Sequence, residues 1–196
     1  MTQTAQLNKL LKEIETKAIA DSVPIICSDT RYFLLSSILP NARILEVGTA
    51  IGYSGILMLS SAKGSTLTTI DMRQERLQQA ANYFKKAGFS ERVKLINADA
   101  LEFLTECNDK FDFIFLDGAI KKYSDMLMHL KRVLEKSGKI VIDNALLLNR
   151  SNAKHTRKFT QKMDEFIRLL QSDSSFKTAM HKIGDGIFVA HYTNKI

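Results

Sequence analysis

Apolar and polar positions follow two different periods along the chain. Within residues 1–22, apolar side chains recur at spacings of three and four, at Leu7, Leu10, Leu11, Ile14 and Ala18. This spacing predicts an amphipathic helix. From residue 42 onward, short apolar runs alternate with stretches of helical periodicity. They predict strands at 43–47, 66–70, 93–96, 111–116 and 139–142, with helices at 53–61, 74–87, 100–106 and 123–136.

The alternation of strand and helix decides the fold class. Parallel strands need crossover connections, and helices in those connections cover both faces of a sheet. The series therefore predicts a doubly wound α/β domain. After a helix at 159–170, two further runs at 176–183 and 187–192 flank Gly184-Asp-Gly186, which predicts an antiparallel strand pair joined by a tight turn. Because no linker-like segment appears, we expect a single domain over 1–196 with its core at 42–196.

Composition and charge narrow the function classes. The chain is 45% hydrophobic, but it holds no apolar run near the roughly 20 residues of a membrane span. It also lacks a basic-then-apolar leader, so we expect a cytoplasmic protein with no membrane partner. Cys27 and Cys107 stand far apart, which argues against a disulfide framework or a cysteine zinc site. The net charge of +7 favours a polyanionic partner.

Basic side chains concentrate in one part of the sequence. Residues 150–162 contain no carboxylate and include Arg150, Lys154, Arg157 and Lys158. Such a run is either a solvated helix face or a surface that follows phosphates. Because it comes shortly after the fifth strand, we expect it at the rim of any site built on the strand ends.

The first three strands end in candidate cofactor residues. In an open parallel sheet, ligands bind beyond the carboxyl ends of the strands. The first strand runs into Glu46-Val-Gly-Thr-Ala-Ile-Gly-Tyr-Ser54-Gly55, a turn that indicates a nucleotide-like ligand. Asp71 is placed to accept from ribose hydroxyls, and Asp99 either caps the next helix or accepts from an adenine amino group. The glycine spacing differs from Gly-x-Gly-x-x-Gly, which argues against a dinucleotide.

Oxygen-bearing side chains end the fourth and fifth strands. Asp117 ends the fourth, and Asp143 and Asn144 end the fifth. Two carboxylates and an amide suit Mg²⁺ or Mn²⁺, whereas the absence of sulfur and imidazole argues against zinc. Asp143 alone would be explained as a helix cap, but the three together predict a metal site.

Together these motifs resemble those of the cation-dependent O-methyltransferases, the family of catechol and caffeoyl-CoA O-methyltransferases. The match begins near Val23-Pro-Ile-Ile26 and runs to the end of the chain, through Phe115-Leu-Asp117, Asp143-Asn144 and Gly184-Asp-Gly186. Within the family, the Val-Pro-Ile-Ile opening and the glycine turn most resemble bacterial tRNA 5-hydroxyuridine methyltransferases. The resemblance implies a Rossmann-like class I methyltransferase sheet, S-adenosylmethionine as the cofactor, and a homodimer.

The resemblance also implies roles for individual residues. It places Glu46, Gly48 and Ser54 around the methionine part of the cofactor, Asp71 at the ribose and Asp99 at the adenine. The further residues implied to bind the cofactor are Thr49, Met72, Ala100 and Asp117.

The proton acceptor is where this sequence departs from the family. A lysine three residues beyond the first metal aspartate, followed by a tyrosine, assists deprotonation in the family. Here Tyr123 stands in place, but Ile120 occupies the lysine position and the lysines are Lys121 and Lys122. Either Lys121 acts with Asp117 in the transfer, or the metal acidifies the hydroxyl unaided, or activity has been lost.

Three functions stay open. The resemblance and the charge favour tRNA as substrate, with the 5-hydroxyl and 4-carbonyl of 5-hydroxyuridine chelating the metal and Arg150, Lys154, Arg157 and Lys158 contacting RNA. The alternatives are O-methylation of a small catechol or caffeoyl-CoA-like molecule, and a methyltransferase fold that binds RNA without catalysis.

Overall fold

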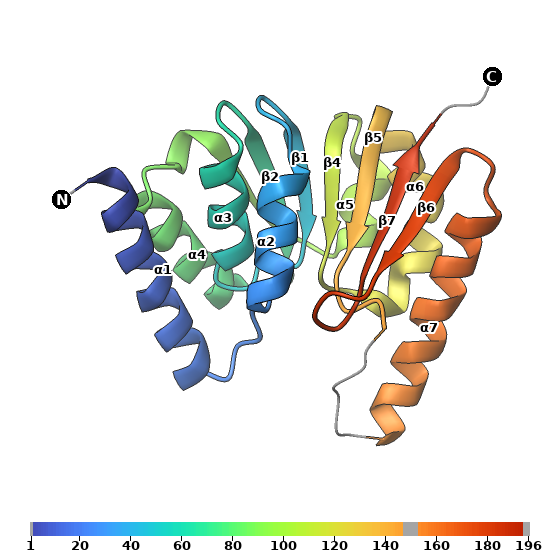
Figure 1. Cartoon of the computed structure of the whole chain (residues 1–196), viewed down its shortest axis with the longest axis horizontal. Coiled ribbons are helices and arrows are strands. Elements are labelled where there is room, and N and C mark those ends of the chain that lie inside the picture. Colours follow the sequence, from blue (N-terminus) through green and yellow to red (C-terminus); the bar gives the residue numbers. More distant parts are fainter. Residues whose placement is uncertain (1, 147–152, 194–196) are drawn as a thin grey trace.

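The strands form one seven-stranded sheet in a computed structural model that describes residues 2–146 and 153–193 (Figure 1). Its order is β3-β2-β1-β4-β5-β7-β6. The strands are β1 (Arg43–Val47), β2 (Thr66–Asp71), β3 (Val93–Asn97), β4 (Phe111–Leu116), β5 (Leu134–Ile142), β6 (Phe176–His181) and β7 (Ile187–Tyr192). Strands β1 to β5 pair in parallel, and β7 is antiparallel to both β5 and β6. The predicted doubly wound sheet with an antiparallel carboxyl-terminal pair is therefore confirmed.

Helices cover both faces of the sheet. They are α1 (Gln3–Ala20), α2 (Ser28–Ser37), α3 (Tyr53–Ser61), α4 (Gln74–Lys86), α5 (Ala100–Glu106), α6 (Tyr123–Val133) and α7 (Ala153–Ser172), with short 3-10 turns η1 (Ser90–Arg92) and η2 (Ile120–Lys122). Helices α2, α3 and α4 lie on one face and α5, α6 and α7 on the other (Figure 1). Helix α1, the predicted amphipathic helix, packs on α3 and α4. In the described ranges, no helix is both long and apolar enough to cross a membrane.

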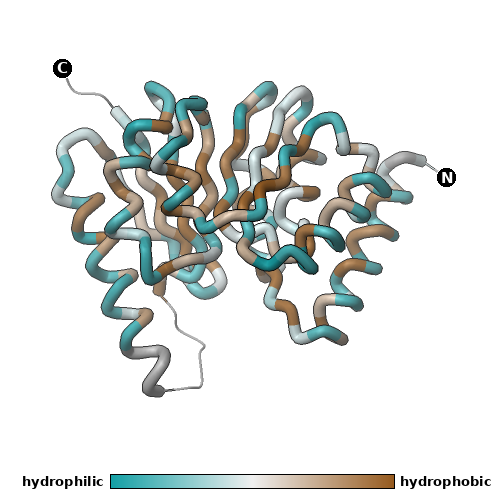
Figure 2. The backbone as a smooth tube through the Cα atoms, turned by 180° about the vertical axis from the view of Figure 1, so that it is seen from behind, coloured by the Kyte–Doolittle hydropathy of each residue, from teal (hydrophilic) through white to brown (hydrophobic). Residues whose placement is uncertain are grey.

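Alternate residues of each strand supply two apolar layers. Ile44 and Phe113 face the layer of α2, α3 and α4, whereas the next residues, Leu45 and Ile114, face α5, α6 and α7. All four are at most 1% exposed. A sheet buried on both faces needs apolar side chains at every position of a central strand. The central strand β4 therefore has a single polar residue, Asp112, while hydropathy alternates along the helices (Figure 2).

The helix predicted at 123–136 is too long. Helix α6 ends at Val133, and β5 begins at Leu134, which pairs with Phe111 of β4. Ser137 then has a φ of +63°, within an irregularity of the β4–β5 register. Because Leu134 is apolar and follows Val133 directly, the break leaves no mark in the apolar spacing.

Two other helices, α2 and α7, also differ from the sequence prediction. Helix α2 was not predicted; it is anchored by two buried residues, Thr30 and Leu34, too few to show a helical period. The helix predicted at 159–170 is α7, Ala153–Ser172. Its added first turns are polar in sequence, so apolar spacing does not mark them.

Candidate active site

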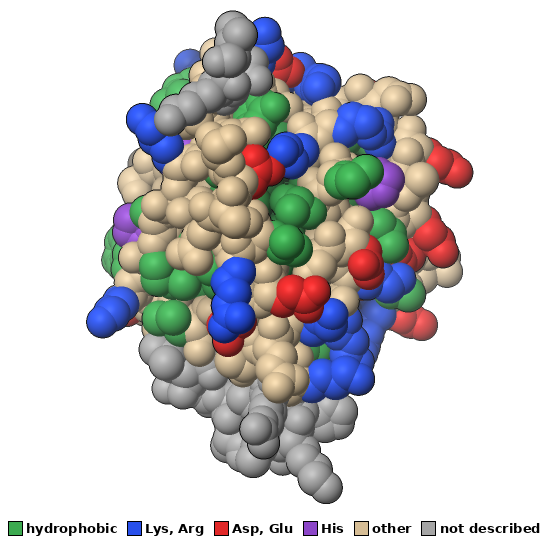
Figure 3. Space-filling view, turned by 90° about the vertical axis from the view of Figure 1, so that its right-hand side faces the viewer, with side chains coloured by type: hydrophobic (Ala, Val, Ile, Leu, Met, Phe, Trp, Pro, Cys, Tyr) green, Lys and Arg blue, Asp and Glu red, His purple; other side chains and the backbone are tan. Residues whose placement is uncertain are grey.

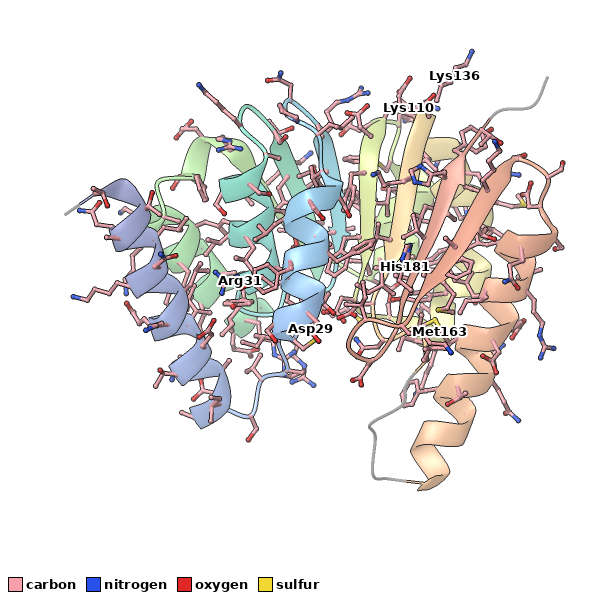
Figure 4. All side chains as sticks on the ribbon, viewed as in Figure 1. Asp29, Arg31, Lys110, Lys136, Met163 and His181 are labelled. Atoms are coloured by element: carbon pink, nitrogen blue, oxygen red, sulfur yellow. The ribbon has the colours of Figure 1, made fainter. Side chains whose placement is uncertain are left out.

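A cavity of about 400 Å³ lies at the carboxyl ends of the parallel strands, within the size range of small-molecule pockets. In Figure 4, Lys110 and Lys136 mark the opposite, amino-terminal edge of the sheet, while Asp29 at the start of α2 lies at the edge where the strands end. The predicted residues that line the cavity are Gly48, Asp71, Met72, Asp99, Ala100, Asp117, Asp143 and Asn144. The candidate cofactor and metal residues thus share one cavity.

The glycine turn joins β1 to the neighbouring strand ends. The backbone N–H groups of Gly48 and Thr49 donate to Ile70 O at 2.9 and 3.2 Å. A Cβ on Gly48, whose φ is +108°, would lie 2.8 Å from Asp117 O. Glycine is therefore required here because two strand ends meet backbone to backbone, and not only for approach to a ligand.

Three of the six described residues other than glycine that have left-handed backbone lie at the site. Ala50, Ala119 and Asn144 have φ values of +45°, +58° and +58°, and all three line the cavity. Such conformations cost of order 1–3 kcal/mol each and recur at functional sites, where the surroundings hold them. The turns after β1, β4 and β5 are thus held in conformations that favour the site over local stability.

A buried polar network lies beneath the turn. Glu46 is fully buried, and it accepts from Ser54 Oγ at 2.5 Å and from Thr69 Oγ1 at 2.6 Å. Because Thr69 uses its hydrogen on Glu46, the Thr49 hydroxyl 2.6 Å away is the donor to Thr69. Burial raises the pKa of Glu46 to about 7, although the bonds from Ser54 and Thr69 oppose that rise. Glu46, Thr49 and Ser54 do not line the cavity, so their predicted contact with a cofactor stays a prediction.

Asp71 ties the glycine turn to the end of β2. Its carboxylate accepts from Ala50 N through Oδ2 and from Arg73 N through Oδ1, both at 2.9 Å. Met72 is 69% exposed and lines the cavity. Arg76 lines it as well, although the sequence prediction did not include it. The geometry thus leaves a carboxylate, a thioether and a guanidinium around one end of the cavity.

Asp99 caps α5, as one of its two sequence interpretations predicted. Its Oδ1 accepts from Leu101 N at 3.0 Å and from Glu102 N at 3.4 Å. Its Oδ2 accepts from Lys122 Nζ at 2.6 Å. The bond from Lys122 is the main cause that lowers the pKa of Asp99, and burial opposes it. The contact to an adenine amino group stays a prediction.

The three predicted metal residues lie together. Asn144 Nδ2 donates to Asp117 Oδ1 at 3.0 Å, and Thr30 Oγ1 donates to Asp143 Oδ1 at 3.2 Å. Burial raises the pKa of the Tyr123 hydroxyl well above its ordinary value, and the nearby charges of Asp117 and Asp143 add to that rise. In the described part of the chain, no three His, Cys, Asp or Glu side chains cluster as metal ligands. A cation here therefore depends on Asn144 as its third donor, and this oxygen set fits Mg²⁺ or Mn²⁺.

A second cavity of about 410 Å³ adjoins the first and shares Asp117, Asp143 and Asn144 with it. The residues that only the second cavity has are Ile120, Lys121, Lys122, Tyr123 and Phe159. It opens on the side of the site that faces α7. Met72 and Asp99 border both cavities as well, so the two cavities form adjoining parts of one site around the metal candidates.

Isoleucine at position 120, with lysines at 121 and 122, changes which side chains line the second cavity. Ile120 lines the second cavity at the position of the family lysine. Lys122 is committed to Asp99, whereas Lys121 is exposed and its Nζ lies 5.3 Å from the centre of the Phe159 ring. Both lysines border the second cavity, but only Lys122 forms an ion pair with Asp99.

The predicted RNA-binding stretch is only partly described. Arg150 lies outside the described residues, and Lys154 and Arg157 belong to α7 but their side chains are not described. Lys158 is exposed. Contact between this stretch and RNA stays a prediction.

The sequence prediction missed part of the cavity wall. Pro24 to Cys27 and Thr30 line the cavity from the segment before α2 and from α2 itself, and Asp185 lines it from the β6–β7 turn. The signal was present, because Val23-Pro-Ile-Ile26 and Gly184-Asp-Gly186 belong to the motifs of the resemblance. The segment from Pro24 to Thr30 precedes the first strand, so strand-end reasoning did not reach it, whereas Asp185 lies in the turn between β6 and β7 and was within reach of that reasoning.

Known proteins of one family resemble the chain in sequence and fold. A sequence profile of the O-methyltransferase family matches residues 1–193. A protein of Mycobacterium avium provisionally named an O-methyltransferase is 34% identical over 161 residues, or 80% of this chain and 72% of that protein. A Staphylococcus aureus structure, provisionally a caffeoyl-CoA O-methyltransferase, shares 26% identity with a TM-score of 0.82, over 93% of this chain and 91% of that one. A Bacillus cereus O-methyltransferase solved with S-adenosylhomocysteine (SAH) has the same fold, at 21% identity and a TM-score of 0.79 over 94% and 90% of the two chains. The chain belongs to the O-methyltransferase family.

Proposed function

We propose that the chain transfers the methyl group of S-adenosylmethionine to a hydroxyl oxygen with the help of a divalent cation. One observation carries the proposal: the glycine turn, Asp71 and Asp99 line the same cavity as Asp117, Asp143 and Asn144. The related Bacillus cereus enzyme, solved with SAH, supports a cofactor of this kind.

The cofactor would lie with its nucleoside toward Asp71 and Met72. Each oxygen of Asp71 accepts one backbone N–H, and a carboxylate oxygen has room for a second donor, such as a ribose hydroxyl. Met72 offers an exposed apolar flank to a base. Asp99, neutralised in part by Lys122, borders the same space.

The cation would be Mg²⁺ or Mn²⁺ held by Asp117, Asp143 and Asn144. When bound, it would supply positive charge that lowers the pKa of an acceptor hydroxyl and fixes its direction. The acceptor oxygen then forms a bond to the methyl carbon as the carbon–sulfur bond breaks, and the sulfur leaves as the neutral thioether. Lys121, beside the second cavity, is the candidate to take the hydroxyl proton. Holding both reactants in line is the main service of such a site.

We further propose 5-hydroxyuridine in tRNA as the acceptor, giving 5-methoxyuridine. The net charge of +7 supports a polyanionic substrate, as does the resemblance of the amino-terminal and glycine-turn motifs. On the face at the β6 edge, the visible Lys and Arg side chains stand in separate groups with Asp and Glu between them (Figure 3). RNA contacts are therefore sought not on that face but at the cavity wall, with Arg76 and Lys121, and at the exposed Lys158, which precedes Phe159 of the second cavity.

Calorimetry with SAH tests the cofactor part of the proposal. We expect SAH to bind the wild-type protein, and Asp71→Asn to weaken binding by about tenfold or more, since one charge-assisted hydrogen bond contributes about 1.5–3 kcal/mol. Asp109→Asn, an exposed aspartate just before β4, is the control and should bind as the wild type does. Absence of SAH binding by the wild-type protein would refute the proposal.

The acceptor is tested with purified protein, labelled S-adenosylmethionine and Mg²⁺. We expect label in tRNA that carries 5-hydroxyuridine, and mass spectrometry of tRNA from cells without the gene should show hydroxyuridine in place of methoxyuridine. Label in small catechols with none in tRNA would favour the small-molecule alternative. SAH binding with no transfer to either class would favour the non-catalytic alternative.

A further inference from the structure

Helix α2 reaches the candidate metal site through one side chain. Thr30 lies in its first turn, is 1% exposed and lines the cavity. Its hydroxyl donates to Asp143 Oδ1 at 3.2 Å, a contact between residues 113 positions apart. An element that the strand pattern did not predict thus touches a predicted metal ligand directly.

The direction of the hydrogen bonds around Thr30 is settled by chemistry. An ionised carboxylate only accepts, so the Thr30 hydrogen points to Asp143. Cys27 Sγ lies 3.3 Å from Thr30 Oγ1, and because the Thr30 hydrogen is already used, the thiol is the donor in that contact. The result is a chain from Cys27 through Thr30 to Asp143 in which the Thr30 hydroxyl has one orientation.

The carboxyl-terminal hairpin holds this pair from the other side. A Cβ placed on Gly184 would lie 2.6 Å from Cys27 Sγ and 3.4 Å from Thr30 Oγ1. A side chain at position 184 would therefore displace the exposed Cys27 thiol, which shows that the β6–β7 turn lies next to the pair. Thr30 is thus bordered by Cys27 on its own side and by the β6–β7 turn on the other.

We propose that Thr30 is a positioning residue for the divalent cation: it fixes the rotation of the Asp143 carboxyl, and through it the docking of α2 sets cation affinity. The inference rests on the proposed function, because it assigns Asp143 to a cation. Asp143 is 5% exposed, and a buried carboxylate depends on protein donors for its orientation. Hydrogen-bond partners that orient metal ligands typically change metal affinity about 10- to 100-fold when removed.

Titration of the full chain with Mn²⁺, without cofactor or acceptor, tests the proposal. Thr30→Val keeps the shape of the side chain and removes the hydroxyl, while Thr30→Ser restores the hydroxyl. Ser65→Ala is the control for the loss of a buried hydroxyl, because Ser65 is fully buried and its Oγ accepts from Ala42 N at 2.8 Å, away from the cavity. Circular dichroism and thermal melting establish that each variant is folded.

We expect Thr30→Val to weaken Mn²⁺ binding about 10- to 100-fold. Thr30→Ser should bind Mn²⁺ nearly as the wild type does, and Ser65→Ala should melt at a lower temperature with unchanged Mn²⁺ affinity. Wild-type Mn²⁺ affinity in Thr30→Val, or equal weakening in Thr30→Ser, would overturn the inference and leave the metal site standing. No Mn²⁺ binding by the wild-type protein would overturn both.

Discussion

Glu46 makes the stability of the protein depend on pH in a defined direction. Burial raises its pKa from 4.5 to about 7 in the folded chain, so the folded state holds this proton more tightly than the unfolded state. Stability from this group is therefore complete below pH 4.5, falls as the pH rises, and is lost above pH 7. A shift of this size corresponds to about 3 kcal/mol in all, of which about 2.5 kcal/mol falls between pH 5 and pH 8.

The variant Glu46→Gln isolates this effect. Glutamine has nearly the same shape and stays neutral, and its amide can accept from one hydroxyl and donate to the other, since the Ser54 and Thr69 hydroxyls do both. We expect the free energy of unfolding of the variant, relative to the wild type, to rise by about 2.5 kcal/mol from pH 5 to pH 8. Other titrating groups cancel in this difference.

Urea unfolding of both proteins at pH 5, 6, 7 and 8 and constant ionic strength measures the difference. Glu75→Gln removes an exposed carboxylate from the first turn of α4 and serves as the control, with little change in slope. Equal slopes for Glu46→Gln and the wild type would refute the reasoning, because they would show that Glu46 is ionised in the folded protein at little cost.

Two further predictions concern packing and charge. Gly88 has a φ of +76°, and no atom lies within 4 Å of where a Cβ would stand. Gly88→Ala should therefore lower the free energy of unfolding by about 1–2 kcal/mol, through backbone strain alone. Gly48→Ala should lower it by about 1–3 kcal/mol more, because the new Cβ would also meet Asp117 O. Urea unfolding compares the two. Lys122→Gln should raise the low pKa of Asp99, because the bond from Lys122 is the main cause that lowers it; NMR titration of Asp99 measures the change. An unchanged Asp99 titration contradicts the ion pair.

The strand ends carried most of the predictable information about the site. Asp71, Asp99, Asp117 and Asp143 each follow an apolar run, and parallel strands bring such positions to one edge regardless of their loops. The structure places all four around the same cavity. These four side chains come together because of the sheet topology, and the alternation of strands and helices in the sequence predicts that topology.

The orientation of Glu46 also lay within reach of the sequence. It is two positions after Ile44 in β1, and residues two apart in a strand face the same side. That side packs against α3, so its carboxylate meets Ser54 and Thr69 instead of the cavity. Contact between Glu46 and a cofactor stays a prediction.

Thr30 could not be found in this way. Its contact with Asp143 joins α2 to the end of β5, and no local period or motif spacing encodes a pairing over such a distance. The same holds for Gly184 against Cys27. Contacts of this kind depend on how complete elements dock, which is decided by the whole core and not by a segment.

The insertion of β7 between β5 and β6 has a consequence for synthesis of the protein on the ribosome. Strand β5 gains its second neighbour only when residues 187–192 have emerged, and until then its edge is open to pairing with other chains. Asp185, in the cavity wall, arrives only shortly before. A nascent chain that stalls before this point therefore combines an unfinished site with an aggregation-prone strand edge.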